Sequence, residues 1–211
     1  MCFHSKQSKD AQALEKRYQA KFDDASLLKT GDFNGFQHPS MAVISNIEPT
    51  KFQFFQWGLI PHWATDASNQ KNTLNARMET INEKSSFRNY TQQRCLIPSD
   101  GFYEWKWLDS KGKSKEKYLL HLPEEAIFSL AGLWSSWTER SSGKSLYTFS
   151  ILTTAANELM SEIHNTKKRM PVIIDPSAEN DWLRAGETVT CNHLLQARKI
   201  NEQAFEQLSL F

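Results

Sequence analysis

The chain has 211 residues, of which 39% are hydrophobic and 23% are charged, and its formal net charge at pH 7 is +1. This composition is typical of a globular protein and argues against disorder, and the length suits one domain, so we expect residues 1–211 to form a single domain. The small net charge excludes a general electrostatic attraction to nucleic acid or to membranes, so such binding would require a local patch.

Cysteine usage and the distribution of apolar residues indicate where the protein works. The three cysteines, Cys2, Cys95 and Cys191, are odd in number and form no CxxC pair, which argues against a disulfide framework and for a reducing compartment. The N-terminus lacks an apolar signal-peptide core, and no apolar run reaches the ~18 residues that a membrane span needs. We therefore expect a soluble cytoplasmic protein that does not bind membranes.

The first part of the chain predicts one amphipathic helix and a pair of strands. Residues 8–22 place apolar side chains on one helical face, with Ser8 as a possible N-cap. After a loop rich in Gly, Asn and Pro, residues 41–47 and 51–59 are predicted to be strands separated by a turn at 48–50. Residues 73–90 are expected to be irregular, with short helices.

The rest of the chain predicts hairpins and short helices. Two strands within residues 94–108 are hinged at 98–101, and a polar, Gly-containing loop at 109–113 leads to a further strand. The remaining predicted elements are a hairpin of strands 127–138 and 145–155, a helix at 157–164, a strand at 170–174 and a mostly helical segment at 177–211. This pattern predicts an α+β fold with a barrel-like core of mainly antiparallel strands and peripheral helices.

Cys2 would become the first residue if Met1 were removed, which a side chain as small as that of Cys permits. The chain would then begin with an amine and a thiol on adjacent carbons, a pair that captures an aldehyde first as a Schiff base and then as a thiazolidine ring. An α-amine has a pKa of ~7.7–8.0, so near pH 7 about a tenth of it is neutral and nucleophilic. The thiol is held in the same residue, which favours ring closure. Most cysteines at position 2 have no such role, so the pattern alone leaves both interpretations open.

The strand that contains Glu104 has two chemically different faces. Tyr103, Trp105 and Trp107 alternate with Phe102, Glu104 and Lys106, and alternation across a sheet puts the two sets on opposite faces. Glu104 is therefore either an exposed glutamate beside Lys106 or a carboxyl placed for a task.

His164 ends the predicted helix at 157–164 and precedes a basic run. It is either a partner of the helix dipole or a general acid–base group. Lys167, Lys168 and Arg169 form the densest basic run of the chain, which is either a solvated face or a phosphate-binding site.

Trp57 and Trp63 flank a Pro-containing loop and are either buried anchors or platforms on which single-stranded nucleic acid stacks. The six histidines show no spacing typical of metal ligands, and no phosphate-binding glycine motif is present, so we expect no metal and no cofactor.

Six pieces of the sequence occur in the order of one known family and together span residues 2 to about 185. They are Cys2, WGLIPHW at 57–63, NAR at 75–77, CLIPSDGFYEW at 95–105, LAGLW at 130–134, and His164 followed by RMP at 169–171. On these motifs the chain resembles the SOS response-associated peptidase (SRAP) family.

The resemblance implies an enzyme that senses abasic sites in single-stranded DNA and crosslinks to them, which protects the lesion during the DNA damage response. Its implied catalytic residues are Cys2 as the nucleophile, Asn75 as a hydrogen-bonding group near the sugar, Glu104 as acid and base, and His164 in opening of the sugar ring. The residues implied in DNA binding are Arg77, Trp63, Trp57, Lys168, Arg169, His4 and Pro39. We expect a monomer whose partner is single-stranded DNA with abasic sites and which joins the nucleoid when engaged on DNA.

The sequence departs from the family near its start and in two loops. Members commonly begin Cys-Gly-Arg, whereas Phe3 and His4 follow Cys2 here, so a phosphate contact at the fourth position is in doubt. The loop that ends at Pro39 is longer than usual, and two extra residues separate His164 from Arg169.

Two other functions use the same residues. In a thiol peptidase, Cys2 and His164 would act as nucleophile and base, and the protein could remove its own Met1. In a non-catalytic module, single-stranded DNA would be bound without a covalent product and with an affinity that falls with salt.

Overall fold

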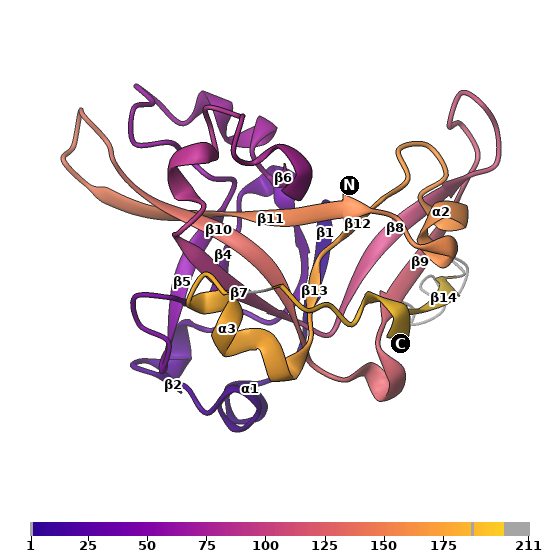
Figure 1. Cartoon of the computed structure of the whole chain (residues 1–211), viewed down its shortest axis with the longest axis horizontal. Helices are drawn as coiled ribbons and strands as arrows, with labels where there is room; N and C mark the ends of the chain where they lie inside the picture. Colours follow the sequence, from indigo (N-terminus) through magenta and orange to yellow (C-terminus); the bar gives the residue numbers. More distant parts are fainter. Residues whose placement is uncertain (1, 187, 201–211) are drawn as a thin grey trace, which may run out of the picture.

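Five strands close into a barrel in the computed structural model, which describes residues 2–186 and 188–200 (Figure 1). The barrel strands are β4 (Ser40–Ser45), β5 (Lys51–Trp57), β7 (Arg94–Ser99), β10 (Phe128–Thr138) and β11 (Ser145–Ala155). The pairs β5–β4, β4–β7, β7–β10 and β10–β11 are antiparallel, and β11 pairs in parallel with β5, which closes the ring. The predicted barrel-like core of mainly antiparallel strands is confirmed.

Alternate residues of these strands fill the barrel. Val43, Ile97 and Phe149 lie in one buried apolar cluster, as the period of two along a strand requires. Gly132 of β10 has no room for a side chain, because a Cβ there would lie 2.5 Å from the Ile97 side chain and 2.8 Å from the Cys95 sulfur. The glycine of the LAGLW stretch is thus a packing requirement of the core.

Four short strands extend the barrel. They are β2 (Lys21–Phe22) on β5, β6 (Asn75–Arg77) and β12 (Arg169–Pro171) on β11, and β13 (Ile173–Ile174) on β10. The strands β6 and β12 matter most for the site, because they carry the NAR and RMP motifs to the same barrel strand.

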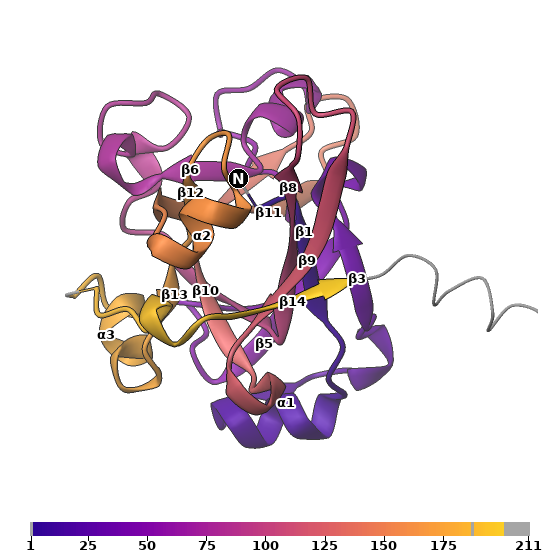
Figure 2. The same ribbon diagram turned by 90° about the vertical axis from the view of Figure 1, so that its right-hand side faces the viewer.

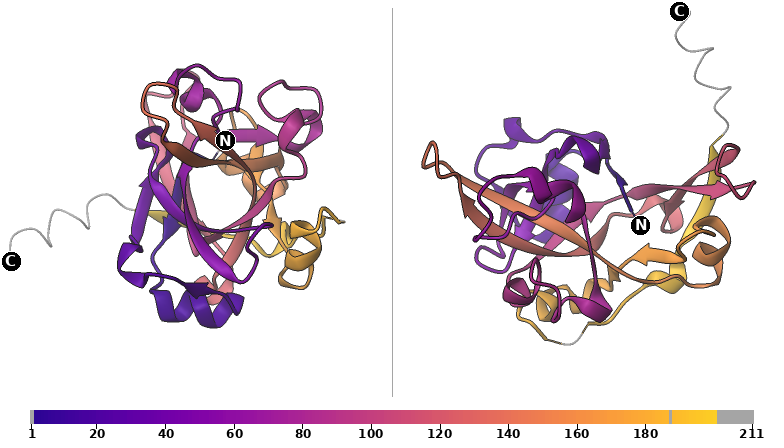
Figure 3. Two further views of the ribbon diagram at one scale, coloured as in Figure 1. Left: turned by 90° about the vertical axis from the view of Figure 1, so that its left-hand side faces the viewer. Right: turned by 90° about the horizontal axis from the view of Figure 1, so that it is seen from above.

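A second sheet lies beside the barrel (Figures 2 and 3). Its strands, in spatial order, are β14 (Gln196–Ile200), β9 (Lys115–His121), β8 (Gly101–Trp107), β1 (His4–Gln7) and β3 (Gly31–Asn34). Phe102 and Leu120 of this sheet belong to the same buried cluster as Phe149 of the barrel. The two sheets therefore share one core.

Three α-helices of the described residues cover the outside. The first is α1 (Ala11–Tyr18), which is shorter than the predicted 8–22 because Asp10 caps it and Ser8 instead hydrogen-bonds Asp100. The second, α2 (Glu158–Ile163), has Asn157 as its N-cap and lies within the predicted helix at 157–164. The third is α3 (Glu179–Leu183). None of the helices in the described part of the chain is long and apolar enough to cross a membrane.

Single turns of 3-10 helix connect these elements. They are Ala25–Leu27, Gly35–Gln37, Ser68–Asn72, Met78–Thr80, Arg88–Tyr90, Pro123–Glu125, Pro176–Ala178 and Asn192–Leu194. Two of them, Met78–Thr80 and Arg88–Tyr90, fall within residues 73–90, where the sequence predicts irregular chain with short helices.

The prediction of a mostly helical segment at 177–211 is wrong for its described part. Beyond α3, the chain forms β14, which pairs antiparallel with β9. The free edge of β9 offers backbone partners that outweigh the weak local preference of the QARKI sequence for a helix. Residues 201–211 lie outside the described part of the chain.

Candidate active site

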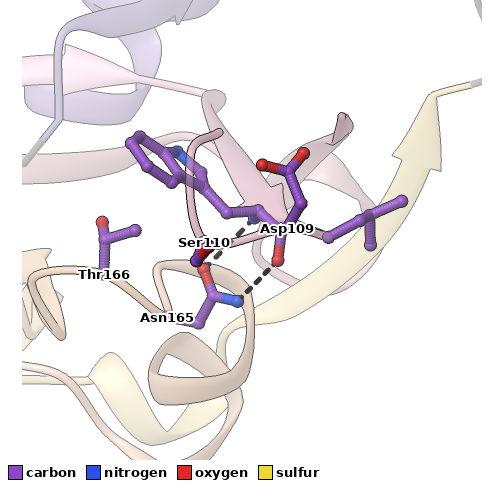
Figure 4. Close-up of a pocket in the computed structure, with 6 residues that line it drawn as sticks. Asp109, Ser110, Asn165 and Thr166 are labelled. Carbon is purple, nitrogen blue, oxygen red and sulfur yellow. Dashed lines mark hydrogen bonds between the residues drawn. The ribbon is translucent and has the colours of Figure 1, made fainter. Parts of the chain in front are cut away.

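Two segments that are far apart in the sequence approach one edge of β8 from opposite ends. Strand β1 covers the beginning of β8, pairing His4 with Tyr103 and Lys6 with Gly101. Further along, the Asn165 side chain accepts from the Trp107 N–H at 3.2 Å and donates to the Trp107 carbonyl at 2.8 Å (Figure 4). Glu104 lies between these two contacts. The chain start and the loop after α2 are thus brought to the same strand, on either side of Glu104.

Cys2 is buried at this edge and fixed through its backbone. The Asn75 side-chain amide donates to the Cys2 carbonyl at 2.9 Å, and the Cys2 sulfur lies 3.8 Å from the His4 carbonyl oxygen. Burial, with the negative charge of nearby Glu104, raises the pKa of the Cys2 thiol far above its ordinary value. The thiol is therefore held in its protonated form.

Asn75 is positioned by the barrel. It lies on β6 opposite Ile151 of β11, so a core strand determines where its amide points. Its Oδ1 atom is buried and accepts no hydrogen bond from the described residues. A buried acceptor without a donor is costly, so this oxygen is suited to a donor supplied by a ligand or by a new amine at the chain start.

Glu104 is 6% exposed and points inward with Phe102, so the interpretation as an exposed glutamate beside Lys106 is wrong. Burial raises its pKa to about 7. A carboxyl with that pKa exists in both protonation states near neutral pH and can both give and take a proton.

His164 caps the C-terminus of α2 and is 7% exposed. Its Nδ1 atom lies 3.1 Å from the Arg169 N–H nitrogen and 2.9 Å from the Arg169 carbonyl oxygen, so the ring is anchored by that edge and chemistry would use Nε2. Burial, with the nearby charges of Arg169 and Lys167, lowers its pKa to about 4. A neutral imidazole is a poor partner for a helix dipole, which favours the acid–base alternative.

The predicted DNA-binding residues divide into exposed and buried ones. Arg77 and Lys168 are exposed, and Trp63 is 47% exposed, so all three are accessible to a ligand. A cleft of about 340 Å³ opens next to Asn75 and is also lined by Arg77 and Lys84. These placements are compatible with a strand of DNA that reaches the buried group.

Two predicted DNA contacts are wrong as the structure stands. Trp57 is fully buried, where its indole N–H donates to the Leu74 carbonyl at 2.9 Å, so it cannot stack on a base. Arg169 is also buried, and both of its terminal nitrogens are 2.8 Å from the Glu79 carboxylate. The positive charge of Arg169 is therefore neutralised within the protein by Glu79.

The other two predicted contacts are partly buried. The His4 ring packs edge-on against Trp105 with centroids 4.8 Å apart, and burial lowers its pKa, so it is neutral at pH 7 and does not replace an arginine. The Pro39 carbonyl accepts from the Trp57 N–H at 2.9 Å and thereby holds the loop against β5.

A sequence model of the SOS response-associated peptidase family matches residues 1–209. The chain belongs to this family. It is 42% identical over 149 residues to the abasic site processing protein YoaM of Bacillus subtilis, covering 70% of this chain and 63% of YoaM. It is 30% identical to the chicken abasic site processing protein HMCES over 74% of this chain and 52% of that protein. The chain thus spans about half to two thirds of these relatives.

Solved structures support the same assignment. A crystal structure of a protein from Bacteroides thetaiotaomicron superposes with a TM-score of 0.86 at 33% sequence identity, covering 97% of this chain and 94% of that one. The SRAP fold therefore extends over almost the whole chain.

Sequence reasoning missed two residues of the site, Glu79 and Asn165. Glu79 neutralises Arg169, and Asn165 ties the His164 loop to β8. No nearby sequence feature predicts that Glu79 belongs to the site, because its partner Arg169 is 90 positions away in the chain. The sequence shows Asn165 directly after His164, but it does not show that Asn165 hydrogen-bonds the backbone of Trp107. Among the described residues, no group of His, Cys, Asp and Glu side chains could hold a metal ion.

The ion pair between Glu79 and Arg169 predicts a pH-dependent stability. The hydrogen bonds from Arg169 lower the pKa of Glu79 from 4.5 to about 2, so the pair stabilises the fold above pH ~4.5 and this contribution is lost as the pH falls toward 2. Glu79→Gln should cost roughly 1–3 kcal/mol at pH 7, because Glu79 is half-exposed but Arg169 is buried. Urea unfolding of both proteins from pH 7 to pH 2.5 measures the difference, which should shrink with acidity; a constant difference would contradict this account.

Proposed function

We propose that the mature chain, once Met1 is removed, captures the aldehyde of an abasic site in single-stranded DNA as a thiazolidine on Cys2. The relatives from Bacillus subtilis and chicken are named abasic site processing proteins. The observation that carries the proposal is that Asn75 holds the Cys2 backbone beside the buried Glu104, with the His164 loop tied to the same strand.

The chemistry needs no cofactor. The Cys2 amine nitrogen adds to the aldehyde carbon of the open-chain sugar, and loss of water gives an imine. The Cys2 sulfur then adds to the imine carbon, and the thiol proton passes to the nitrogen. Both bonds form within one residue, so the second step has the high effective molarity of a positioned intramolecular nucleophile.

Each neighbouring residue has a proton or a hydrogen bond to supply. Glu104 takes a proton from the attacking amine and returns one to the leaving hydroxyl, because its pKa of about 7 suits both tasks. Neutral His164 accepts the hydroxyl proton when the cyclic sugar opens. The unsatisfied Oδ1 of Asn75 accepts from the new amine or from the sugar. The crosslink so formed would protect the lesion from cleavage.

Chemical blocking of the aldehyde in the abasic DNA distinguishes this proposal from its alternatives. Purified protein lacking Met1 is mixed with uracil-excised single-stranded DNA, either untreated or pre-treated with an alkoxyamine. We expect a slowly migrating species on a denaturing gel with the untreated DNA only. Equal covalent yield with both DNAs, or none with either, would contradict the proposal. Binding of both DNAs without a covalent product would indicate a non-catalytic module. In a separate assay, turnover of an unrelated peptide would indicate a thiol peptidase.

A further inference from the structure

The hairpin that joins β8 and β9 carries an unusual density of positive charge. Residues 106–117 contain five lysines and only two carboxylates, whereas the whole chain has a net charge of +1. The Asp109 carboxylate accepts from the backbone N–H groups of Lys111, Lys113 and Ser114, so it serves to hold the turn. Glu116 pairs with Lys199 and Tyr118. Both carboxylates thus have partners within the protein.

An open groove lies between this hairpin and the loop after α2. It has a volume of about 470 Å³ and is lined by Trp107, Leu108, Asp109, Ser110, Asn165 and Thr166 (Figure 4). The exposed Lys167 and Lys168 follow directly in the chain. Asn165, which lines the groove, directly follows His164 in the chain, so the groove and the candidate active site share the loop after α2.

Trp107 gives the groove an aromatic surface held in a fixed position. A Cβ on Gly112 would lie 2.7 Å from three atoms of the indole, so the glycine turn packs directly against the ring. Gly112 also has a φ of +64°, which other residues rarely adopt. The ammonium of Lys115 stands 4.9 Å from the ring centroid. An aromatic ring bordered by lysines is how proteins hold unpaired nucleotides.

We infer that this hairpin groove, lined by Trp107, Leu108, Asp109, Ser110, Asn165 and Thr166 and followed on the hairpin by Lys111, Lys113 and Lys115, binds the single-stranded DNA that continues from the abasic nucleotide on one side. A base stacks on Trp107, and the hairpin lysines neutralise the phosphates. The inference rests on the proposed function, which places the abasic site at Cys2. It adds the path that the DNA strand follows on one side of that site.

The test compares two hairpins at opposite ends of the molecule (Figure 1). The variants are Lys111→Gln with Lys113→Gln on the β8–β9 hairpin and, as the matched control, Arg140→Gln with Lys144→Gln on the β10–β11 hairpin; all four side chains are exposed. Binding of a labelled, undamaged single-stranded oligonucleotide is followed by fluorescence anisotropy over a range of salt concentrations. The slope of log affinity against log salt should fall by about 1.4 for the first variant only, at ~0.7 per phosphate contact. Equal slopes for both variants would overturn the inference.

The aromatic part is tested with Trp107→Ala and Trp107→Phe. Loss of one stacked base should weaken binding about tenfold in the alanine variant, and phenylalanine should restore most of it. Affinity unchanged by Trp107→Ala would remove the stacking site. Thermal unfolding of both variants checks that the hairpin change leaves the fold intact.

A third measurement uses abasic oligonucleotides with a long flank on only one side of the lesion. The lysine variant should crosslink more slowly with one polarity alone, and an equal defect with both would contradict a local path. If even the unmodified protein forms no crosslink, the proposed function fails. The anisotropy comparison still tests whether the groove binds DNA, because it uses undamaged DNA, which carries no aldehyde.

Discussion

A Cys2→Ser protein is expected to form no heat-stable crosslink with abasic single-stranded DNA, yet to form an imine that borohydride can trap. Serine keeps the α-amine and is small enough for Met1 to be removed, so the first step survives. Its hydroxyl is a much weaker nucleophile than a thiol, so the ring does not close. Denaturing gels run after heating, with and without borohydride, separate the two steps.

Cys2→Ala is the matched control for this experiment. It also retains a small N-terminal residue with a free amine, and should behave like the serine variant. A stable crosslink at the unmodified level in either variant would place the reactive group elsewhere. Loss of the borohydride-trapped species in both would mean that the thiol is needed before the imine forms.

Glu104→Gln is expected to slow crosslinking by ~10²–10⁴-fold, the range that general acid–base groups contribute. Glutamine keeps the size of the side chain and its place on β8 but cannot exchange a proton. The measurement is the single-turnover rate at pH 7 with excess protein. A rate within threefold of the unmodified protein would remove Glu104 from the mechanism.

Stability distinguishes this effect from a folding defect. The folded pKa of Glu104, about 7, lies above its ordinary value of 4.5, so ionising the buried carboxyl costs stability as the pH rises through 7. Glu104→Gln should therefore be at least as stable as the unmodified protein at pH 8. Arg140→Gln, on the β10–β11 hairpin at the other end of the molecule, is the control that should change neither the rate nor the stability appreciably.

The strands were predictable because their signals are local. Alternating apolar residues and Gly-containing turns gave the hairpins β8–β9 and β10–β11, and Asn157 marked the start of α2. The strand pair that closes the barrel was not predictable, because β5 and β11 are parallel and lie about 90 positions apart, as in the Trp57–Phe149 pair. For β14, too, the edge of a distant strand decided the structure.

The candidate site was only partly predictable, for the same reason. Reactivity singles out Cys2, and motif position singles out Asn75, Glu104 and His164, which the fold brings to neighbouring elements. Charge and aromatic character do not reveal burial, so Trp57 and Arg169 look like DNA contacts in the sequence and are interior groups in the structure. A buried tryptophan and a paired arginine differ from exposed ones only through residues far away.

The central claim is that the chain start itself is the aldehyde trap, and intact mass spectrometry tests it most directly. Protein produced in cells is measured before and after incubation with a short abasic oligonucleotide, and the adduct is digested and sequenced. We expect a protein that lacks Met1, a gain equal to the oligonucleotide minus one water, and all of the added mass on Cys2. An adduct on a lysine, or an equal yield from protein that retains Met1, would contradict the claim.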